Sequence, residues 1–504
     1  MNKPATRMDI DLQVMSKLHV FKSKAKLTKI VSICFMVTAL FSACANEKYQ
    51  AKPINPQQVT AKILAKDPLS ADFKAYLIKQ GYVESSLPFA SWGLQQMTLS
   101  ALYHHTKLDI AKAQLGFANA QLASASLKQN PTLNGSLARS NQANGDIRPW
   151  AYGLNVEIPI ETAGKRQIKI EEAQHLVEVA RIDVADTAWQ LRSQIASDLL
   201  QYHENIAQQK LLQQALDNQQ KIVGILQKRV ALGALSNTDL SASKLLLQAK
   251  KDALNNKQQN LREISAKLAA DAGLTLEKFN QIPVQALALE ATMATPIQPD
   301  AFKSLQQKAL LNRLDIRRSL EKYAAAEAKI KLEVAKQTPD ITLNPGFIFE
   351  FGDSIWSLGF SSLLNLLNNN PNTQQTLIAE ATQLREIEGA QFEALQANII
   401  ANLSQVTARY TAAQQNLTNT QQLQIAQQVY MSKLNKQFAA GAIDRLELTQ
   451  ASLNAQLVDT QVLAAQFDVL KNANEIEDML QYPLGEINQT QVFPHDTFLF
   501  DKSK

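Results

Sequence analysis

Apolar and small residues recur at three- and four-residue spacing along two long stretches of the chain, residues 162–273 and 372–480. Ile195, Leu199 and Tyr202 show this spacing among runs of Gln, Asn, Lys and Glu, which is the pattern of an amphipathic helix. Each stretch lacks Pro and is broken once, at a Leu-Gly-Ala-Leu or an Ala-Gly-Ala-Ile segment. Up to its break the first helix would have about seventy residues, or roughly 100 Å at 1.5 Å per residue. Helices of this length occur in coiled coils, helical arrays and tubes.

Short segments with an apolar residue at every second position precede both helical stretches. A period of two over about ten residues predicts strands with one apolar and one polar face. A hairpin covered by a protein core would show the same alternation, so this pattern alone is weak. Trp150, Tyr152 and Trp356 flank the strands and fit an interfacial aromatic girdle, with packing on neighbouring strands as the alternative. The apolar positions that would face lipid are Tyr152, Leu154, Val156, Ile158, Leu343, Phe347, Phe349, Trp356, Leu358 and Phe360.

The second half of the chain repeats the first at an offset of 206 to 210 residues. Residues 108–110 and 314–316 both read Leu-Asp-Ile, and the Gly-containing breaks of the two long stretches also align. Each copy predicts a helix (101–129 or 301–337), two strands, a very long helix, a Gly-marked turn and a shorter return helix. The predicted divisions are a signal peptide (1–44), an N-terminal segment (45–100), repeat 1 (101–285), a linker (286–300), repeat 2 (301–485) and a C-terminal tail (486–504).

The first 44 residues have the features of a bacterial secretory signal. Lys22, Lys24, Lys26 and Lys29 precede an apolar run of about a dozen residues that ends in Ser-Ala-Cys, and this run is too short to span a membrane permanently. The sequence ending at Cys44 resembles a lipobox, in which Cys44 would become the acylated first residue. Ordinary cleavage at the Ala-Cys-Ala site without lipid is the alternative.

Charge and candidate chemistry argue against several classes of function. Residues 1–44 hold seven Lys or Arg and two acids, so the remainder carries 44 of each sign and gives no electrostatic reason for nucleic-acid binding. The two cysteines lie in or at the end of the leader, and the adjacent His104 and His105 are interpreted as surface or helix-cap residues. There is no nucleophile elbow, phosphate loop or metal-ligand spacing, so we expect neither an enzyme nor a bound cofactor.

The duplicated order of elements behind a lipoprotein-like signal resembles the TolC-like outer-membrane efflux protein family. It is particularly similar to the outer-membrane lipoproteins of tripartite resistance-nodulation-division pumps of the heavy-metal and drug type. The segments that carry the resemblance are residues 232–240, residues 440–448 and the strand entry at Asn130-Pro131-Thr132-Leu133. The resemblance covers roughly residues 100–485, and no single motif decides it.

The resemblance implies a mainly α fold with a small β part. Three chains would each give four strands to a shared twelve-stranded transmembrane barrel, which removes unpaired strand edges, and their helices would form a periplasmic α-barrel tunnel. Lys165 and Arg166 would lie solvated at the junction of barrel and tunnel. The implied assembly is a homotrimer in outer-membrane lipid with a periplasmic adaptor protein and an inner-membrane pump. The implied function is passive conduction of substrates to the outside.

The resemblance also assigns roles at the two Gly turns, which in this family form the periplasmic constriction and the contact with the adaptor. Glu447 stands where an acidic residue rings the aperture, Phe438 where an aromatic residue gates it, and Asp239 resembles an acidic partner on the other hairpin. An acid in the first turn of a helix also stabilises its dipole, so helix-end chemistry is the alternative for both acids. Two departures are Gln450 in place of a second acidic ring and Ile443 in place of a basic latch, for which Arg445 could substitute. The turn residues are Leu232, Gly233, Ala234, Leu235, Gly441, Ala442 and Ile443.

The sequence is also compatible with other functions. The first is the outer-membrane duct of a type I protein secretion system, and the second a structural coiled-coil envelope lipoprotein. A scaffold would have strict long heptads and no lipid-facing strands, so the alternating segments count against it. A periplasmic adaptor would carry one helical hairpin, whereas this chain has two. The sequence leaves the exported cargo open among metal ions, drugs and polypeptides.

Overall fold

The computed structural model describes residues 49–141, 149–288, 306–307, 310–311, 313–350, 352–362 and 371–482, with side chains in the last range from residue 374. The chain divides into two units after Leu64. In the first unit the described part contains helix α2 (Pro56–Leu64). Cys44, the rest of the predicted leader, most of the linker and the C-terminal tail lie outside the described residues.

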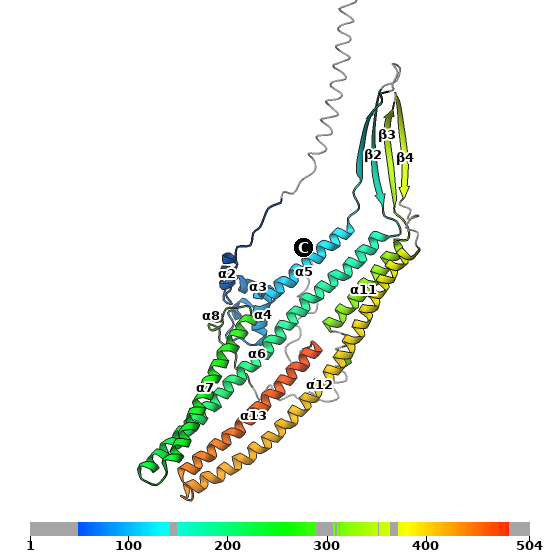
Figure 1. The fold of residues 1–504 in the computed structure, drawn as a ribbon. Coiled ribbons are helices and arrows are strands. Elements are labelled where there is room, and N and C mark those ends of the chain that lie inside the picture. Colours follow the sequence, from blue (N-terminus) through cyan, green and yellow to red (C-terminus); the bar gives the residue numbers. More distant parts are fainter. Residues whose placement is uncertain are drawn as a thin grey trace, which may run out of the picture. The chain divides into compact units, whose positions relative to one another are not determined.

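The second unit contains two matching sets of helices, one from each repeat (Figure 1). The long helices are α6 and α12, of 67 and 69 residues, which confirms the length inferred from the apolar pattern. No helix within the described residues is both long and apolar enough to cross a membrane. The first set is α5 (Thr106–Ser126), α6 (Lys165–Ala231) and α7 (Asn237–Asp271), and the second is α11 (Leu314–Ala335), α12 (Pro371–Ala439) and α13 (Arg445–Leu480).

The strands of both repeats join in one antiparallel sheet of order β1-β2-β3-β4. Each repeat contributes one hairpin, and the second strand of repeat 1 pairs with the first strand of repeat 2, with Leu154 opposite Phe347. Strand β1 begins at Thr132, within the strand entry at residues 130–133. The strands are β1 (Thr132–Arg139), β2 (Trp150–Ile160), β3 (Ile341–Glu350) and β4 (Asp353–Ser362).

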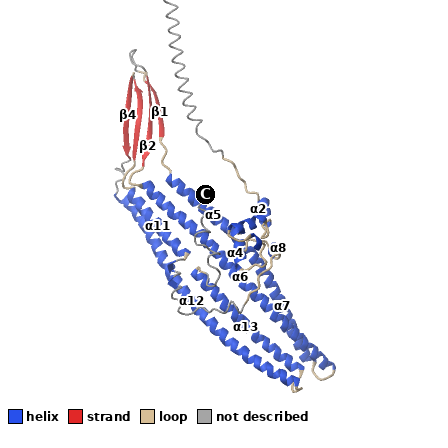
Figure 2. Ribbon diagram, turned by 180° about the vertical axis from the view of Figure 1, so that it is seen from behind, coloured by secondary structure: helices blue, strands red, loops and turns tan. Residues whose placement is uncertain are grey.

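The helices lie side by side in an order that follows the strand order (Figure 2). Helices α5 and α7 both pack on one side of α6, while α11 and α13 pack between α6 and α12. The sheet lies at one end of this array and the two Gly turns at the other (Figure 1). Because α5 and α7 form one edge and α12 the other, the array within one chain has two open edges.

A small helical body packs on α6 and the end of α7. Its core buries Phe73, Trp92 and Met97 with Ile195 of α6 and Leu268 of α7, each at most 1% exposed. This burial of large apolar side chains ties the N-terminal segment to the first repeat. The body comprises α3 (Ala71–Lys79), the 3₁₀ turn η1 (Glu84–Ser86), α4 (Leu94–His104) and α8 (Leu276–Phe279).

The first helix predicted for repeat 1, over 101–129, is two helices that break at His105. His105 caps α5, because its Nδ1 accepts a hydrogen bond from the Lys107 amide at 3.1 Å. The prediction of a surface or cap position is wrong for His104, which is buried against the ring of Phe73. This burial lowers the pKa of His104 to about 4. The break packs closely on Gly273, where an added Cβ would lie 2.8 Å from that of His104, so glycine permits this approach.

The prediction that Lys165 is solvated is wrong, because Lys165 is only 6% exposed. Its ammonium donates to the Thr338 carbonyl at 2.6 Å and to Asp340 Oδ1 at 2.7 Å, and the Thr162 amide also donates to Asp340. Burial alone would raise the pKa of Asp340, but the bonds from Lys165 and Thr162 outweigh it and lower that pKa. These bonds fasten the helix entry of repeat 1 to the strand entry of repeat 2.

Lys165→Met is expected to lower the free energy of unfolding by about 1–3 kcal/mol, because the substitution removes two hydrogen bonds from a charged donor. Unfolding by denaturant in detergent, followed by circular dichroism, measures the change. Arg166→Met, at the next and more exposed position, is the control and should be nearly neutral. Equal losses in the two variants would show that the Lys165 bonds contribute nothing specific.

Candidate functional site

Both long helices end in the same turn, built around a glycine with left-handed backbone. Gly233 has φ 71° and Gly441 φ 74°. After α6 the Gly233 amide donates to the Val230 carbonyl and the Ala234 amide to the Arg229 carbonyl, both at 2.9 Å. The same pair of bonds follows α12, from Gly441 and Ala442. This is the Schellman arrangement, which satisfies carbonyls at a helix end and favours glycine at the left-handed position.

Gly233→Ala is expected to destabilise the first turn by about 1–2 kcal/mol, because a left-handed alanine is strained even though no atom lies within 4 Å of the added methyl. Gly224→Ala, inside α6 and equally free of contacts, should be neutral or stabilising, since alanine favours a helix interior. Hydrogen exchange of the amides at the turn measures the difference. If both variants behaved alike, backbone strain would not be what selects glycine at position 233.

The return helices start at side-chain caps that accept hydrogen bonds from the backbone amides of the two predicted acids. Ser236 caps α7, accepting from the Asp239 amide, and its hydroxyl donates to Asp239 Oδ2 at 2.8 Å. Asp444 caps α13, accepting from the Glu447 amide at 2.9 Å. Asp239 and Glu447 are both exposed in the first turn of their helices. The arrangement therefore fits the helix-end role, and it leaves both carboxylates open to solvent at the turns.

The remaining candidate gate residues lie on the second turn. The Arg445 guanidinium lies over the half-buried ring of Phe438, 5.9 Å from its centroid. Gln450 is exposed one turn further along α13. On the first turn Leu232 is 83% exposed, and Ala234 is exposed as well. Phe438, Arg445 and Glu447 thus share one turn, while Asp239 belongs to the other.

An ion pair that the sequence reasoning missed joins the two turns. Arg229, in the last turn of α6, donates to Asp444 Oδ2 at 2.6 Å, across 215 positions of sequence. The hydrogen bond from Arg229 and that from the Glu447 amide lower the pKa of Asp444, so the carboxylate is charged at neutral pH. Leu446 of α13 also packs on a buried cluster of the first hairpin that includes Leu226 and Leu240. The sequence offered a basic residue, Arg229, before the first Gly turn and an acid, Asp444, after the second. Only the folded arrangement shows that the two side chains form a pair.

The sheet carries most of its large apolar side chains on one face, with Ile348 and Ile355 paired on the other. The register sets Tyr152 opposite Phe349, with stacked rings 4.9 Å apart, and Phe347 opposite Trp356. All ten strand residues predicted from the alternation fall on this face, and the register adds Leu133 and Leu137 of β1. The opposite face is mainly polar and small; its members include Asn134, Ser136, Asn155, Glu157, Thr342, Asn344, Ser357 and Ser361.

Within the described part of one chain, no element covers the apolar face. Trp356, Leu358 and Phe360 are 81%, 76% and 81% exposed. Exposed apolar patches of this kind mark contacts with a membrane or with another protein. On the polar face Asn134 donates to Glu157 at 2.9 Å and Asn344 to Ser361 at 3.1 Å, so polar groups bond to one another across the strands.

The model of the outer membrane efflux protein family matches residues 99–274. The match lies within the first repeat and covers less than half of the chain. The pyoverdine export outer membrane protein OpmQ of Pseudomonas aeruginosa is 24% identical over 272 residues, which cover 51% of this chain and 56% of OpmQ. The chain therefore aligns with little more than half the length of that relative. The cation efflux system protein CusC of Escherichia coli O157:H7 is 21% identical over 400 residues, covering 75% of this chain and 82% of CusC.

The fold agrees with that of solved structures of outer membrane channels. The outer-membrane channel OprN superposes with a TM-score of 0.64 at 17% identity, over 87% of this chain and 99% of OprN. The family model and these relatives confirm the predicted resemblance to outer membrane efflux proteins and support the predicted outer-membrane location, while OprN shows the likeness of the fold. No group of three or more His, Cys, Asp or Glu within the described ranges could hold a metal ion.

Proposed function

We propose that this outer membrane efflux protein is the exit duct of a tripartite efflux system, which conducts substrates passively from an inner-membrane pump and a periplasmic adaptor to the outside. One observation carries the proposal. The sheet has one apolar and one polar face, and each of its hairpins is followed along the chain by a very long helix, α6 or α12. Such a sheet can border lipid on one side and water on the other, as a membrane channel requires.

Three copies would close the duct. Among the described strands of one chain, β1 and β4 are unpaired edges, and unpaired edges in lipid leave backbone groups without hydrogen-bond partners. The edge helices of the array also expose apolar residues, including Phe117 on α5, Leu245 on α7 and Ile425 on α12. A heterologous contact between these edges, repeated by rotation, gives a closed ring. Three sets of four strands would form the twelve-stranded barrel.

The two Gly turns would form the periplasmic end of the duct, where the adaptor binds and the passage opens and closes. Two observations support this role. The turns lie at the end of the long helices that is opposite to the sheet (Figure 1), and the side chains of Leu232 and Glu447 are exposed there. The Arg229–Asp444 pair would hold the two hairpins of each chain together in the closed state. This interaction replaces the Arg445 latch as the preferred candidate. Acylation of Cys44 remains a prediction from the leader sequence.

Deletion of the gene, followed by growth on metal salts, siderophores, dyes and drugs, tests the function. We expect sensitivity to at least one class, restored by the intact gene but not by one in which residues 232–235 and 440–443 are replaced by Gly-Ser linkers. Purification from detergent should co-isolate an adaptor with the intact chain and not with the linker variant. Full export without this protein, together with no adaptor bound, would contradict the proposal.

A further inference from the structure

Two carboxyl groups meet where the end of α7 packs on α6. Asp198 of α6 is fully buried, with 0% exposure. Its Oδ1 accepts from the Lys267 ammonium at 2.7 Å, and both of its oxygens lie 3.1 Å from the Gln194 amide nitrogen. Asp271, the last residue of α7, follows Lys267 by one helical turn and therefore lies on the same face of α7, toward the Asp198 side chain. Asp198 thus has donors from α6 and α7, and a second acid beside it.

One carboxyl oxygen of Asp271 lacks a hydrogen-bond partner. Its Oδ2 is buried and has no hydrogen-bond partner among the described residues. Two ionised carboxylates are acceptors only, so a hydrogen bond between Asp198 and Asp271 requires one of the two groups to carry a proton. Removal of that proton would leave two like charges side by side in a partly buried position.

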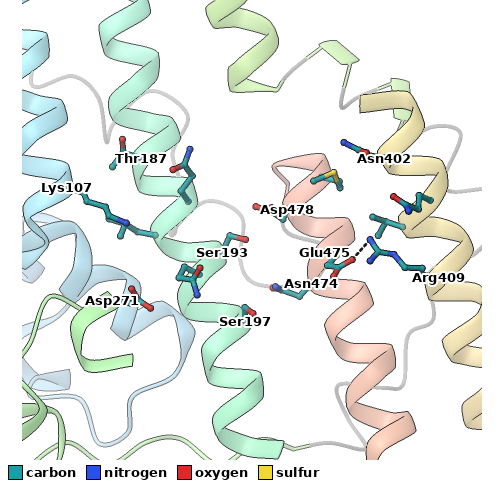
Figure 3. A pocket seen from close by; sticks show the side chains of 16 residues that line it. Lys107, Thr187, Ser193, Ser197, Asp271, Asn402, Arg409, Asn474, Glu475 and Asp478 are labelled. Carbon is teal, nitrogen blue, oxygen red and sulfur yellow. Dashed lines mark ion pairs between the residues drawn. The ribbon is translucent and has the colours of Figure 1, made fainter. Parts of the chain in front are cut away.

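The charged surroundings reduce this repulsion without cancelling it. Burial, the hydrogen bond with Asp198 and the negative charge of Asp198 raise the pKa of Asp271 to about 7, while Lys267 and Lys107 act in the opposite direction. Asp271 and Lys107 line one side of a polar cavity of about 560 Å³ (Figure 3). The charged groups across the cavity are Arg409, Glu475 and Asp478; Arg409 pairs with Glu475 at 2.7 Å, and Asp478 accepts from the Trp189 indole.

We propose that Asp198 and Asp271 hold one proton between them, and that its release through the adjoining cavity loosens the contact between α6 and the end of α7. The proton resides on Asp271, because Asp198 already receives the Lys267 and Gln194 donors. When it leaves to solvent, Asp271 becomes a carboxylate facing the Asp198 carboxylate. The neighbouring residues Leu268 and Ala269 lie in the core of the helical body, so the first repeat would loosen at this contact.

The direction of the pH dependence follows from linkage. Asp271 binds its proton more tightly in the closed contact than in an opened one, where its pKa would return toward 3.8. The stabilisation is therefore complete below about pH 4 and is lost as pH rises to about 7. Over that range the opening equilibrium constant is expected to rise up to about tenfold per pH unit and to level off above it.

Infrared spectroscopy of the full-length protein in detergent and D₂O measures the proton directly. We expect a carbonyl stretching band of a protonated carboxyl group that disappears with a midpoint near pH 7. The band should be missing from Asp271→Asn, whose amide replaces the proton as donor to Asp198. It should persist in Asp252→Asn, which changes an exposed carboxylate of the same helix. Absence of a band titrating above pH 6 in the unaltered protein would overturn the proposal.

Hydrogen exchange of the amides of residues 267–271, corrected for the intrinsic effect of pH, tests the mechanical consequence. The opening constant should rise with pH in the unaltered protein and in Asp252→Asn, and should be independent of pH in Asp271→Asn. A flat profile in the unaltered protein, or the same slope in Asp271→Asn, would show that the proton does not control this contact. Neither readout depends on transport, so failure here would leave the proposed duct untouched.

Discussion

Leu358→Arg is expected to remove most of the protein from the outer membrane. Leu358 lies in the middle of β4 on the apolar face, and its side chain is 76% exposed in one chain. An arginine at the lipid-facing midplane of a barrel costs about 2–4 kcal/mol. A symmetric trimer carries the substitution in all three copies. If the three sites are independent, the assembled trimer is destabilised by about 6–12 kcal/mol. Membrane fractionation with an immunoblot measures the amount assembled.

Ser357→Arg is the matched control, because Ser357 is the preceding residue on the polar face. A charge there would enter the water-filled side of the proposed barrel and should leave assembly nearly normal. The difference between two adjacent positions separates the sidedness of the sheet from a general intolerance of β4. If Leu358→Arg assembled as well as Ser357→Arg, the assignment of the apolar face to lipid would be wrong.

Asp444→Ser is expected to raise the open probability of the duct in planar bilayers. The serine preserves the cap of α13, since Ser and Asp are comparable at that position, and it removes the ion pair with Arg229. Both partners are partly exposed, and such pairs contribute about 0.2–1 kcal/mol. Three copies would contribute about 0.6–3 kcal/mol, or roughly a 3- to 150-fold change in the ratio of open to closed states.

A double-mutant cycle identifies the pair as the cause. Arg229→Gln alone should open the duct to a similar extent, and adding Asp444→Ser to it should change little, because the interaction is already lost. Additive effects of the two substitutions would mean that each acts through a different contact. Unaltered conductance in both single variants would exclude this ion pair as a constraint on opening.

The periodic features of the fold could be predicted from the sequence because they depend on local patterns. Three- and four-residue spacing gave α6 and α12, and alternation gave the face that Tyr152 and Leu358 share. Gly233 and Gly441 were predictable as turn residues, since glycine favours the left-handed backbone that they adopt. Each of these inferences required neighbours in sequence only.

Other contacts could not be predicted, because they join residues that are distant in sequence. Nothing near Lys165 indicates that Asp340 will lie beside it, and the pairing of β2 with β3 is what brings them together. The break at His105 carries no Pro or Gly, and it lies against Gly273, which is distant in sequence. Arg229 was missed at the turns because its partner belongs to the other repeat.

Native mass spectrometry of the detergent-extracted protein tests the central proposal most directly, because closure of the open-edged sheet and helical array requires a fixed number of copies. We predict a single dominant species with the mass of three mature chains, and no stable monomer at concentrations where the protein is folded. A folded monomer as the dominant species, or a complex of any other number of chains, would contradict the three-chain duct.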